Sequence, residues 1–260
     1  MQPSTSGDPD PDSRQQGPRS IRTQQCLSRQ GFPLRDRQAD GQGLLRLSWW
    51  QTSVVHVVDK YVSKMRNLAD SDVDLEVDAR FVDMLIPRRA RVLDLGCGIG
   101  SAVNALRQRG HEAYGIDPSE PALGVAADLF DSGWYRQLRA EDLFGSSLEE
   151  LGLPLRYECV LMAGNVPAFL TSTELQAAFN NTARILSPAG LLVTGTSTQS
   201  CGGPRDQDEA ADASGLALHS RFSNWHLSPF TNDPWCVSIY KAPGVPATPA
   251  GPDGMFILHS

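Results

Sequence analysis

Lysine is scarce in this chain of 260 residues, which has three lysines and twenty arginines. The 30 acidic residues outnumber the 23 basic ones and give a net charge of −7. Proteins that bind nucleic acid usually carry a basic surface, so this balance argues against nucleic acid as a partner. The sequence also lacks a run of roughly 18 apolar residues and a basic-then-apolar leader, which argues against a membrane helix and a secretion signal. The chain is therefore predicted to be cytoplasmic and to have no membrane segment.

The five cysteines are scattered and include no C-x-x-C pair, so no metal site is predicted. Residues 1–45 are rich in Pro, Ser, Gly, Gln, Asp and Arg and have few large apolar side chains. Such a composition cannot bury enough surface to offset its ordering entropy and predicts a disordered extension. The Pro- and Gly-rich residues 242–260 are predicted to form a flexible tail. One folded domain is expected over residues 46–241.

The most informative stretch of the sequence is Arg91–Ser101. An apolar run interrupted by Asp94 is followed by three glycines at alternate positions and then by a helical pattern of apolar residues. This order predicts a strand, a tight loop and a helix. Glycines let a backbone approach a ligand closely, and a helix start offers unpaired N–H groups. Because a buried acid without a partner is costly, Asp94 is expected at the end of the strand beside a polar group.

The segment Asp94-Leu-Gly-Cys-Gly-Ile-Gly100 resembles motif I, D-x-G-x-G-x-G, of the class I S-adenosylmethionine (SAM)-dependent methyltransferases. A nicotinamide-dependent oxidoreductase would carry G-x-G-x-x-G, but here Ser101 stands at the position of the third glycine. The resemblance implies that SAM is the cofactor and that a methyl group is transferred to a small-molecule acceptor. An NAD(P)-dependent oxidoreductase and a non-catalytic protein that keeps the SAM fold are the alternatives.

Further apolar runs alternate with helical patterns along the rest of the domain. Strands are predicted to end at Asp117 and to cover Leu138–Leu143, Glu158–Ala163, Leu191–Thr196 and Trp235–Tyr240. The family resemblance implies an α/β fold with a doubly wound, mostly parallel sheet of seven strands that binds its ligand at the strands' carboxyl ends.

Two further expectations concern segments that flank the strands. The resemblance implies an N-terminal helical lid over the site, for which Trp49, Trp50 and Tyr61 are candidates. The polar stretch Ser197–Asp212 is predicted to be a mobile loop.

Asp117 stands 21 positions after Gly96, about where a βαβ unit places an acid on a ribose. A carboxylate suits two ribose hydroxyls because it accepts two hydrogen bonds at once. The resemblance further implies that Asp142, or alternatively Glu141, binds the adenine amino group. The predicted cofactor-binding residues are Asp94, Gly96, Cys97, Gly98, Gly100, Asp117, Pro118, Asp142, Leu143 and Asn165.

The fourth predicted strand runs into Gly164-Asn-Val-Pro167, which resembles the same region in a bacterial subgroup of the family. It differs from the N-P-P-[YF] motif of methyltransferases that act on amino groups of nucleic acids or of glutamine. Asn165 is therefore predicted to lie near the methionine half of SAM and the acceptor, and it is the first catalytic candidate. His226 is the second, as a base for an acceptor that must lose a proton. The other interpretation is an exposed His226 beside a core Trp225.

Overall fold

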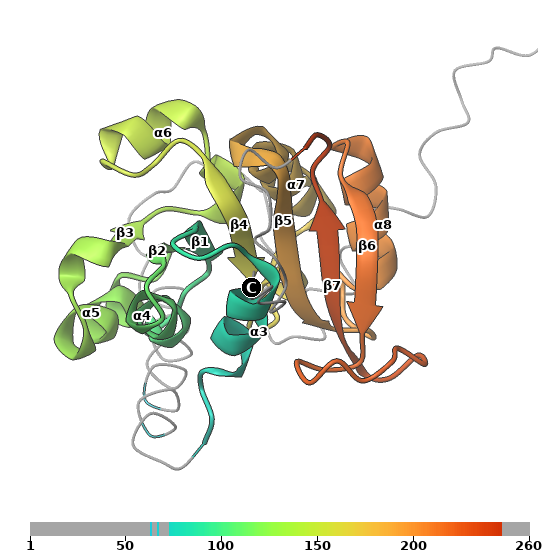
Figure 1. The fold of residues 1–260 in the computed structure, drawn as a ribbon, viewed down its shortest axis with the longest axis horizontal. Coiled ribbons are helices and arrows are strands. Elements are labelled where there is room, and N and C mark those ends of the chain that lie inside the picture. Colours follow the sequence, from blue (N-terminus) through green and yellow to red (C-terminus); the bar gives the residue numbers. More distant parts are fainter. Residues whose placement is uncertain (1–62, 64–66, 68–72, 246–260) are drawn as a thin grey trace, which may run out of the picture. The chain divides into compact units, whose positions relative to one another are not determined.

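The computed structural model describes Ser63, Asn67 and residues 73–245 of the chain. These residues contain a seven-stranded sheet with helices on both faces (Figure 1). The strand order is β3-β2-β1-β4-β5-β7-β6, and strands β1 to β5 run parallel. The strands are β1 (Arg91–Leu95), β2 (Glu112–Asp117), β3 (Tyr135–Gln137), β4 (Tyr157–Met162), β5 (Leu186–Ser197), β6 (Ala217–Phe222) and β7 (Trp235–Lys241). The predicted mostly parallel, seven-stranded α/β sheet is confirmed.

Some predictions fall on other parts of the chain. The disordered segment expected over residues 1–45, the lid with Trp49, Trp50 and Tyr61, and the tail from residue 246 onward lie outside the described residues. They stay predictions. In the part of the chain that the structure describes, no helix is long and apolar enough to cross a membrane.

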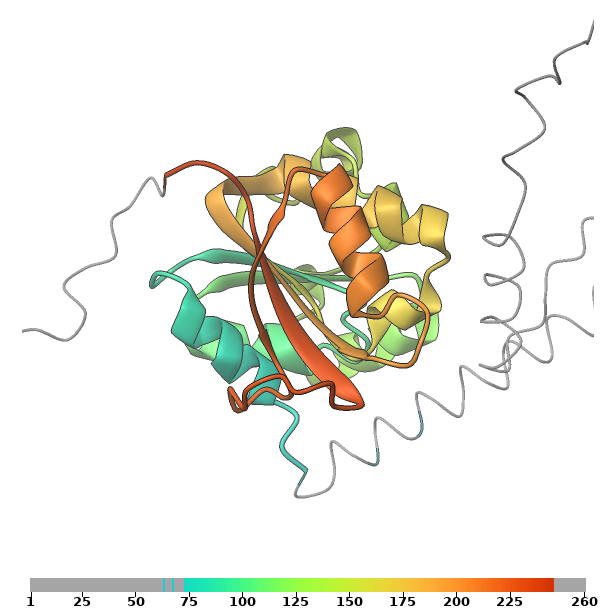
Figure 2. The same cartoon turned by 90° about the vertical axis from the view of Figure 1, so that its right-hand side faces the viewer.

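Two hydrophobic cores, one on each face of the sheet, hold the helices in place (Figure 2). One face is covered by α3 (Val77–Leu85), α4 (Ser101–Gln108) and α5 (Glu120–Leu129), and the other by α6 (Gly145–Glu150), α7 (Ser172–Ile185) and α8 (Pro204–Ala213). Successive strand side chains point to opposite faces. In β1, Val92 belongs to the core of α3 and α4, whereas Leu93 and Leu95 belong to the core of α7. Asp94 therefore faces the α3 side.

Helix α7 begins with a capping box formed by two residues three positions apart in the chain. The Thr171 hydroxyl accepts a hydrogen bond from the Glu174 N–H, and the Glu174 carboxylate accepts one from the Thr171 N–H at 2.8 Å. This reciprocal pair satisfies two N–H groups that a helix start leaves without partners.

Strand β7 pairs antiparallel with both β5 and β6, and Trp235 lies opposite Ser197. The start of β7 is therefore at the carboxyl edge of β5. Aromatic side chains gather at this edge on the α3 side. The Phe81 ring lies 6.0 Å from that of Phe222 and 5.4 Å from that of Trp225, both edge-on.

The prediction of a third strand over Leu138–Leu143 is wrong. Strand β3 comes earlier and is three residues long, and a 3-10 helix at Ala140–Asp142 follows it. Ala140 and Leu143 are buried on the side of α7, where the Asn181 side chain donates to the Glu141 carbonyl at 2.8 Å. Packing of Ala140 and Leu143 on the side of α7 thus favours a helical turn where a strand was predicted.

The loop predicted over Ser197–Asp212 is also wrong for most of its length, because α8 occupies it. The helix begins at Pro204, whose fixed φ suits a first helical position. It is held by buried contacts: Ala210 and Ala211 pack in the core, and the Thr194 hydroxyl donates to the Gln207 side chain at 2.7 Å.

Candidate active site

The glycine loop, residues 96–100, links β1 to α4 at the carboxyl edge of the sheet. The N–H groups of Gly96 and Cys97 both donate to the Ile116 carbonyl, at 2.8 and 3.1 Å. The Gly98 N–H donates to the Asp117 carboxylate at 2.9 Å. Three bonds to β2 therefore set the path of the loop.

Close packing requires two of the glycines. Gly96 and Gly100 have φ values of +77° and +83°, in the left-handed region that favours glycine. A Cβ on Gly96 would lie 2.5 Å from Cγ2 of Val166, and one on Gly100 would lie 2.5 Å from the Tyr135 hydroxyl oxygen. The first contact brings the loop that follows β4 against the glycine loop. Asn165, next to Val166, is thereby brought close to the predicted cofactor site.

The Asp117 carboxylate is 8% exposed and holds two backbone groups. One oxygen accepts from the Gly98 N–H at 2.9 Å and the other from the Ser119 N–H at 2.8 Å. Burial raises the pKa of Asp117, while these two bonds act in the opposite direction. Each carboxylate oxygen keeps a second lone pair, so the group retains the capacity to accept from two hydroxyls.

Cys97 packs under the loop. A Cβ on Gly115 would lie 2.6 Å from the Cys97 sulfur, so the thiol fills the space that this glycine leaves. Burial raises the pKa of the thiol well above its ordinary value, with Asp94 and Asp117 adding to the shift. The side chain therefore stays a thiol and acts as a small packing group rather than a nucleophile.

Asp94 is 4% exposed, and none of the residues that the structure describes donates a hydrogen bond to its carboxylate. It stands near the end of β1 as expected, but the expected polar partner is not found in the described part of the chain. Burial raises the pKa of Asp94 well above its ordinary value, and the negative charges of Asp78 and Asp117 add to it.

The predicted adenine end of the site lies after β3. The Glu141 carboxylate is bound by the guanidinium of Arg139, whereas Asp142 is exposed and its carboxylate lies 4.0 Å from Arg139. Leu143 is buried, and Pro118 is exposed with its carbonyl accepting from Gln137 at 3.1 Å. Asp142 therefore has the more accessible of the two carboxylates.

Asn165 has a left-handed backbone, with φ of 67°. Its side-chain oxygen accepts from the Thr196 hydroxyl and the Ser197 N–H, both at 2.9 Å, and its own N–H donates to the Gly195 carbonyl at 3.0 Å. These bonds join the ends of β4 and β5. The amide oxygen is thus engaged within the protein, and the side-chain NH₂ is the group left to meet a ligand.

His226 lies apart from these residues. It is exposed, in the loop between β6 and β7, and its backbone N–H donates to the Asn224 side-chain oxygen at 2.9 Å. His226 interacts electrostatically with Asp74. The pKa of Asp74 is lowered to about 2, chiefly by its hydrogen bond with Arg80, and His226 makes the smallest contribution. Trp225 beside it packs against the core of α3.

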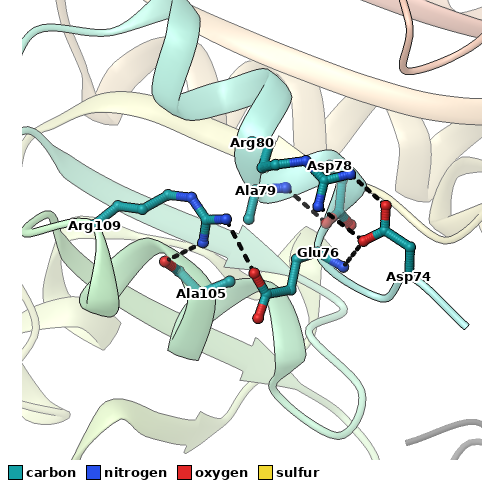
Figure 3. Close-up of polar contacts among 7 residues, drawn as sticks. All are labelled: Asp74, Glu76, Asp78, Ala79, Arg80, Ala105 and Arg109. Carbon is teal, nitrogen blue, oxygen red and sulfur yellow. Dashed lines mark hydrogen bonds and ion pairs between the residues drawn. The ribbon is translucent and has the colours of Figure 1, made fainter. Parts of the chain in front are cut away.

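Asp78 is a residue that no sequence pattern singled out. It is the second residue of α3 and lies half-buried among the charged side chains drawn in Figure 3. Burial raises the pKa of Asp78 to about 6. An acid in the first turn of a helix is common because it interacts favourably with the helix dipole, so the pattern alone did not mark it.

Comparison with known proteins shows similarity to methyltransferases. A model described as a methyltransferase domain matches residues 92–190. The ubiquinone biosynthesis O-methyltransferase of Agrobacterium fabrum is 33% identical over 110 residues, which are 41% of this chain and 40% of that protein. That of Stutzerimonas stutzeri is 37% identical over 81 residues, 30% of this chain and 34% of that protein. The chain spans less than half the length of these curated relatives.

Solved structures extend the similarity over most of the domain. A TehB-like SAM-dependent methyltransferase from Corynebacterium glutamicum superposes with a TM-score of 0.65 at 26% identity, over 73% of this chain and 99% of that one. The CcbJ methyltransferase from Streptomyces caelestis shares the fold, with a TM-score of 0.55 at 19% identity over 65% of this chain and 89% of its own.

The sheet order and the glycine loop at the carboxyl edge define a Rossmann-like α/β protein. Taken with the methyltransferase-domain match over residues 92–190 and the similarity to the TehB-like enzyme, they support the predicted class I SAM-dependent methyltransferase family.

Proposed function

We propose that this protein transfers a methyl group from SAM to a small-molecule acceptor. The observation that carries the proposal is the hydrogen bond from the Gly98 N–H to the Asp117 carboxylate, because it holds the acid proposed to bind the ribose beside the glycine loop. Asp94 near the end of β1, Asp142 after β3 and Asn165 after β4 lie around the same carboxyl edge. Ligands bind at this edge in doubly wound sheets.

The donor supplies a sulfonium-bound methyl group that is already a strong electrophile. The work left to the protein is to bind and orient two molecules, and orientation alone contributes much of the acceleration in such reactions. We assign the ribose to Asp117, the adenine amino group to Asp142 and the methionine half to the glycine loop and Asp94. Asn165, whose position is locked by Thr196 and Ser197, faces the reacting groups with its side-chain NH₂.

The acceptor is proposed to be a small molecule with an apolar, planar face. Two half-buried tryptophans, Trp225 and Trp235, lie against Gly195 in β5, where an added Cβ would be 2.4 Å from the Trp225 ring and 3.2 Å from the Trp235 ring. The Gly195 carbonyl also accepts a hydrogen bond from the Asn165 backbone N–H. The two tryptophans and Asn165 therefore all lie next to Gly195. Aromatic rings favour stacked or edge-on contact with other planar groups.

The net charge of −7 gives no general attraction for nucleic acid, and we infer a cytoplasmic small-molecule enzyme. The test is calorimetric titration with S-adenosylhomocysteine, SAM and NAD, followed by transfer of labelled methyl groups to a panel of planar phenols, amines and carboxylates. We expect binding of the two sulfur compounds and turnover of at least one acceptor. Binding of NAD without SAM would overturn the proposal in favour of an oxidoreductase. SAM binding without turnover on any acceptor would favour the non-catalytic alternative.

A further inference from the structure

Gln207 is a fully buried polar residue in α8, and both ends of its side-chain amide form hydrogen bonds. The amide oxygen accepts from the Thr194 hydroxyl in β5 at 2.7 Å. The amide NH₂ donates to the carbonyl of Gly202, in the loop between β5 and α8, at 2.5 Å. A shift of either partner would leave a buried polar group without a hydrogen bond, which is costly. Gln207 therefore fixes the loop after β5 against that strand.

The loop that Gln207 fixes lies against the segment that carries Asn165. A Cβ on Gly202 would lie 2.0 Å from the carbonyl oxygen of Pro167, so the two backbones are in direct contact. Pro167 belongs to the 3-10 helix Val166–Phe169, and Asn165 is the N-cap residue of that helix. Gly202 therefore limits where the residues directly after Asn165 can lie.

The contacts return to Asn165 through β5. Side chains two positions apart on a strand point to the same face, so Thr194 and Thr196 lie side by side on β5. Thr194 binds Gln207, and the Thr196 hydroxyl donates to the Asn165 side-chain oxygen at 2.9 Å. The contacts form a closed ring of five residues and one short helix: Asn165, the 3-10 helix after it, Gly202, Gln207, Thr194 and Thr196. Asn165 is thus held from both its backbone and its side chain.

We propose that Gln207 is a positioning residue for methyl transfer and acts through this ring on Asn165. The inference rests on the proposed function, in which the Asn165 side-chain NH₂ faces the reacting groups. Misplacing a group by about 1 Å can lower a rate on the order of 100-fold, even when the substitution lies far from the chemistry. The glycine loop, Asp117 and Asp142, which are assigned to SAM, lie outside the ring. Loss of Gln207 therefore affects turnover more than it affects SAM binding.

The experiment compares Gln207→Met with a matched control, Gln176→Met, in the whole protein. Methionine fills much of the same space but has no N–H donor and only a weak acceptor. Gln176 also connects helices through its amide, which donates to Asn180 at 3.2 Å and to Ser214 at 3.1 Å, but it is not part of the ring. Both substitutions should lower the free energy of unfolding in urea. With an acceptor found in the panel, we expect Gln207→Met to lower kcat about tenfold or more and to change KM for SAM less than about threefold. Gln176→Met should leave both within about twofold.

A second measurement reports the position of Asn165 directly. The side-chain NH₂ signals of Asn165 are observed by NMR in protein that carries isotope-labelled asparagine, and their loss in Asn165→Ser assigns them. We expect these signals to move or broaden in Gln207→Met, with and without S-adenosylhomocysteine, and to stay unchanged in Gln176→Met. If Gln207→Met does not fold, Thr194→Val opens the ring by removing one hydroxyl and enters both measurements with the same expectations.

The outcomes separate the inference from the function on which it rests. Failure of the wild type to bind S-adenosylhomocysteine, or to methylate any acceptor, overturns both. In an active wild type, the inference requires a selective fall in kcat together with changed Asn165 signals. Equal losses of kcat in Gln207→Met and Gln176→Met show a general structural effect and overturn the inference alone. An unchanged kcat or unchanged Asn165 signals in Gln207→Met do the same.

Discussion

Two groups of acids on opposite faces of the sheet have opposite surroundings. On the α8 face, Asp208 accepts from Arg221 at 2.6 and 3.2 Å and from the Tyr240 hydroxyl at 2.8 Å. Arg221 in turn donates to the Ser238 hydroxyl at 2.9 Å. On the α3 face, neither Asp78 nor Asp94 forms an ion pair with another described residue, and the Arg80 guanidinium close to Asp78 binds Asp74. Among the described residues, Asp208 is therefore paired with a cation, whereas Asp78 and Asp94 are not.

This difference distinguishes a structural acid from a binding acid. A half-buried carboxylate with an arginine and a hydroxyl helps to hold three elements together, and its removal affects folding. Two unpaired carboxylates cost folding free energy, and proteins keep such arrangements mainly at functional sites. We therefore expect substitutions of binding acids to change ligand affinity, and substitutions in the Asp208 group to change the free energy of unfolding.

The largest effect is expected for Asp117→Ala. This acid is the one that supports the loop and is also assigned to the ribose. Its loss should weaken S-adenosylhomocysteine binding by about 1.5–3 kcal/mol, roughly 10- to 150-fold, because bonds to a charged group are lost. Titration calorimetry measures the change, with circular dichroism as the folding control. A folded variant with unchanged affinity would remove Asp117 from the site.

Arg221→Met tests the complete group. The substitution keeps an apolar stem but leaves Asp208 and Tyr240 without their cation, so we expect a loss of about 1.5–3 kcal/mol in the free energy of unfolding. The affinity for S-adenosylhomocysteine should stay within about twofold, because the group lies on the other face of the sheet. Urea unfolding and calorimetry give the two values. A large fall in affinity in a folded variant would contradict the separation of the two groups.

Asp78→Asn should stabilise the ligand-free protein. The pKa of Asp78 is raised from 3.8 to about 6 by burial, with Asp74 adding to it and Arg80 opposing it. The folded state therefore binds more protons than the unfolded state between these values, so wild-type stability falls as pH rises through this window. At pH 7 we expect a gain of roughly 1–2 kcal/mol in the variant, less than the full shift implies because the group is half-buried and because Asp favours a helix start.

The pH dependence provides the check on that gain. Thermal unfolding of wild type and Asp78→Asn at pH 4 and pH 7 should show the difference at pH 7 and lose most of it at pH 4, where the wild-type acid is protonated in the folded state. A constant difference at both pH values would show that the charge of Asp78 is not its cause.

The smallest effect is expected for His226→Ala. His226 is exposed and interacts weakly with an acid already bound by Arg80, so stability should change by less than about 0.5 kcal/mol. Turnover should fall only for an acceptor that must lose a proton. Asn165→Ala is the positive control, because it removes the amide that joins β4 to β5 and should cut turnover with any acceptor. Identical pH–rate profiles for wild type and His226→Ala would exclude the histidine as a base, and full activity of Asn165→Ala would remove Asn165 from the site.

Local sequence determined much of this protein. The three alternating glycines, Asp117 and the Thr171 capping box each depend on residues close together in the chain, so the loop, the end of β2 and the start of α7 were predictable. The apolar runs predicted most of the strands, and the family resemblance implied a mostly parallel α/β sheet. The family resemblance also implied that SAM binds at the carboxyl edge of the sheet.

Tertiary structure decided the rest. Leu138–Leu143 forms a turn and not a strand because α7 packs on it, and α8 forms because Gln207 and its alanines are buried against the sheet. Helix α3, which carries Asp78, packs on the face of β1 that carries Asp94. No local pattern records that packing, since 15 residues separate the two acids and the two elements come together only when the helix docks on the strand.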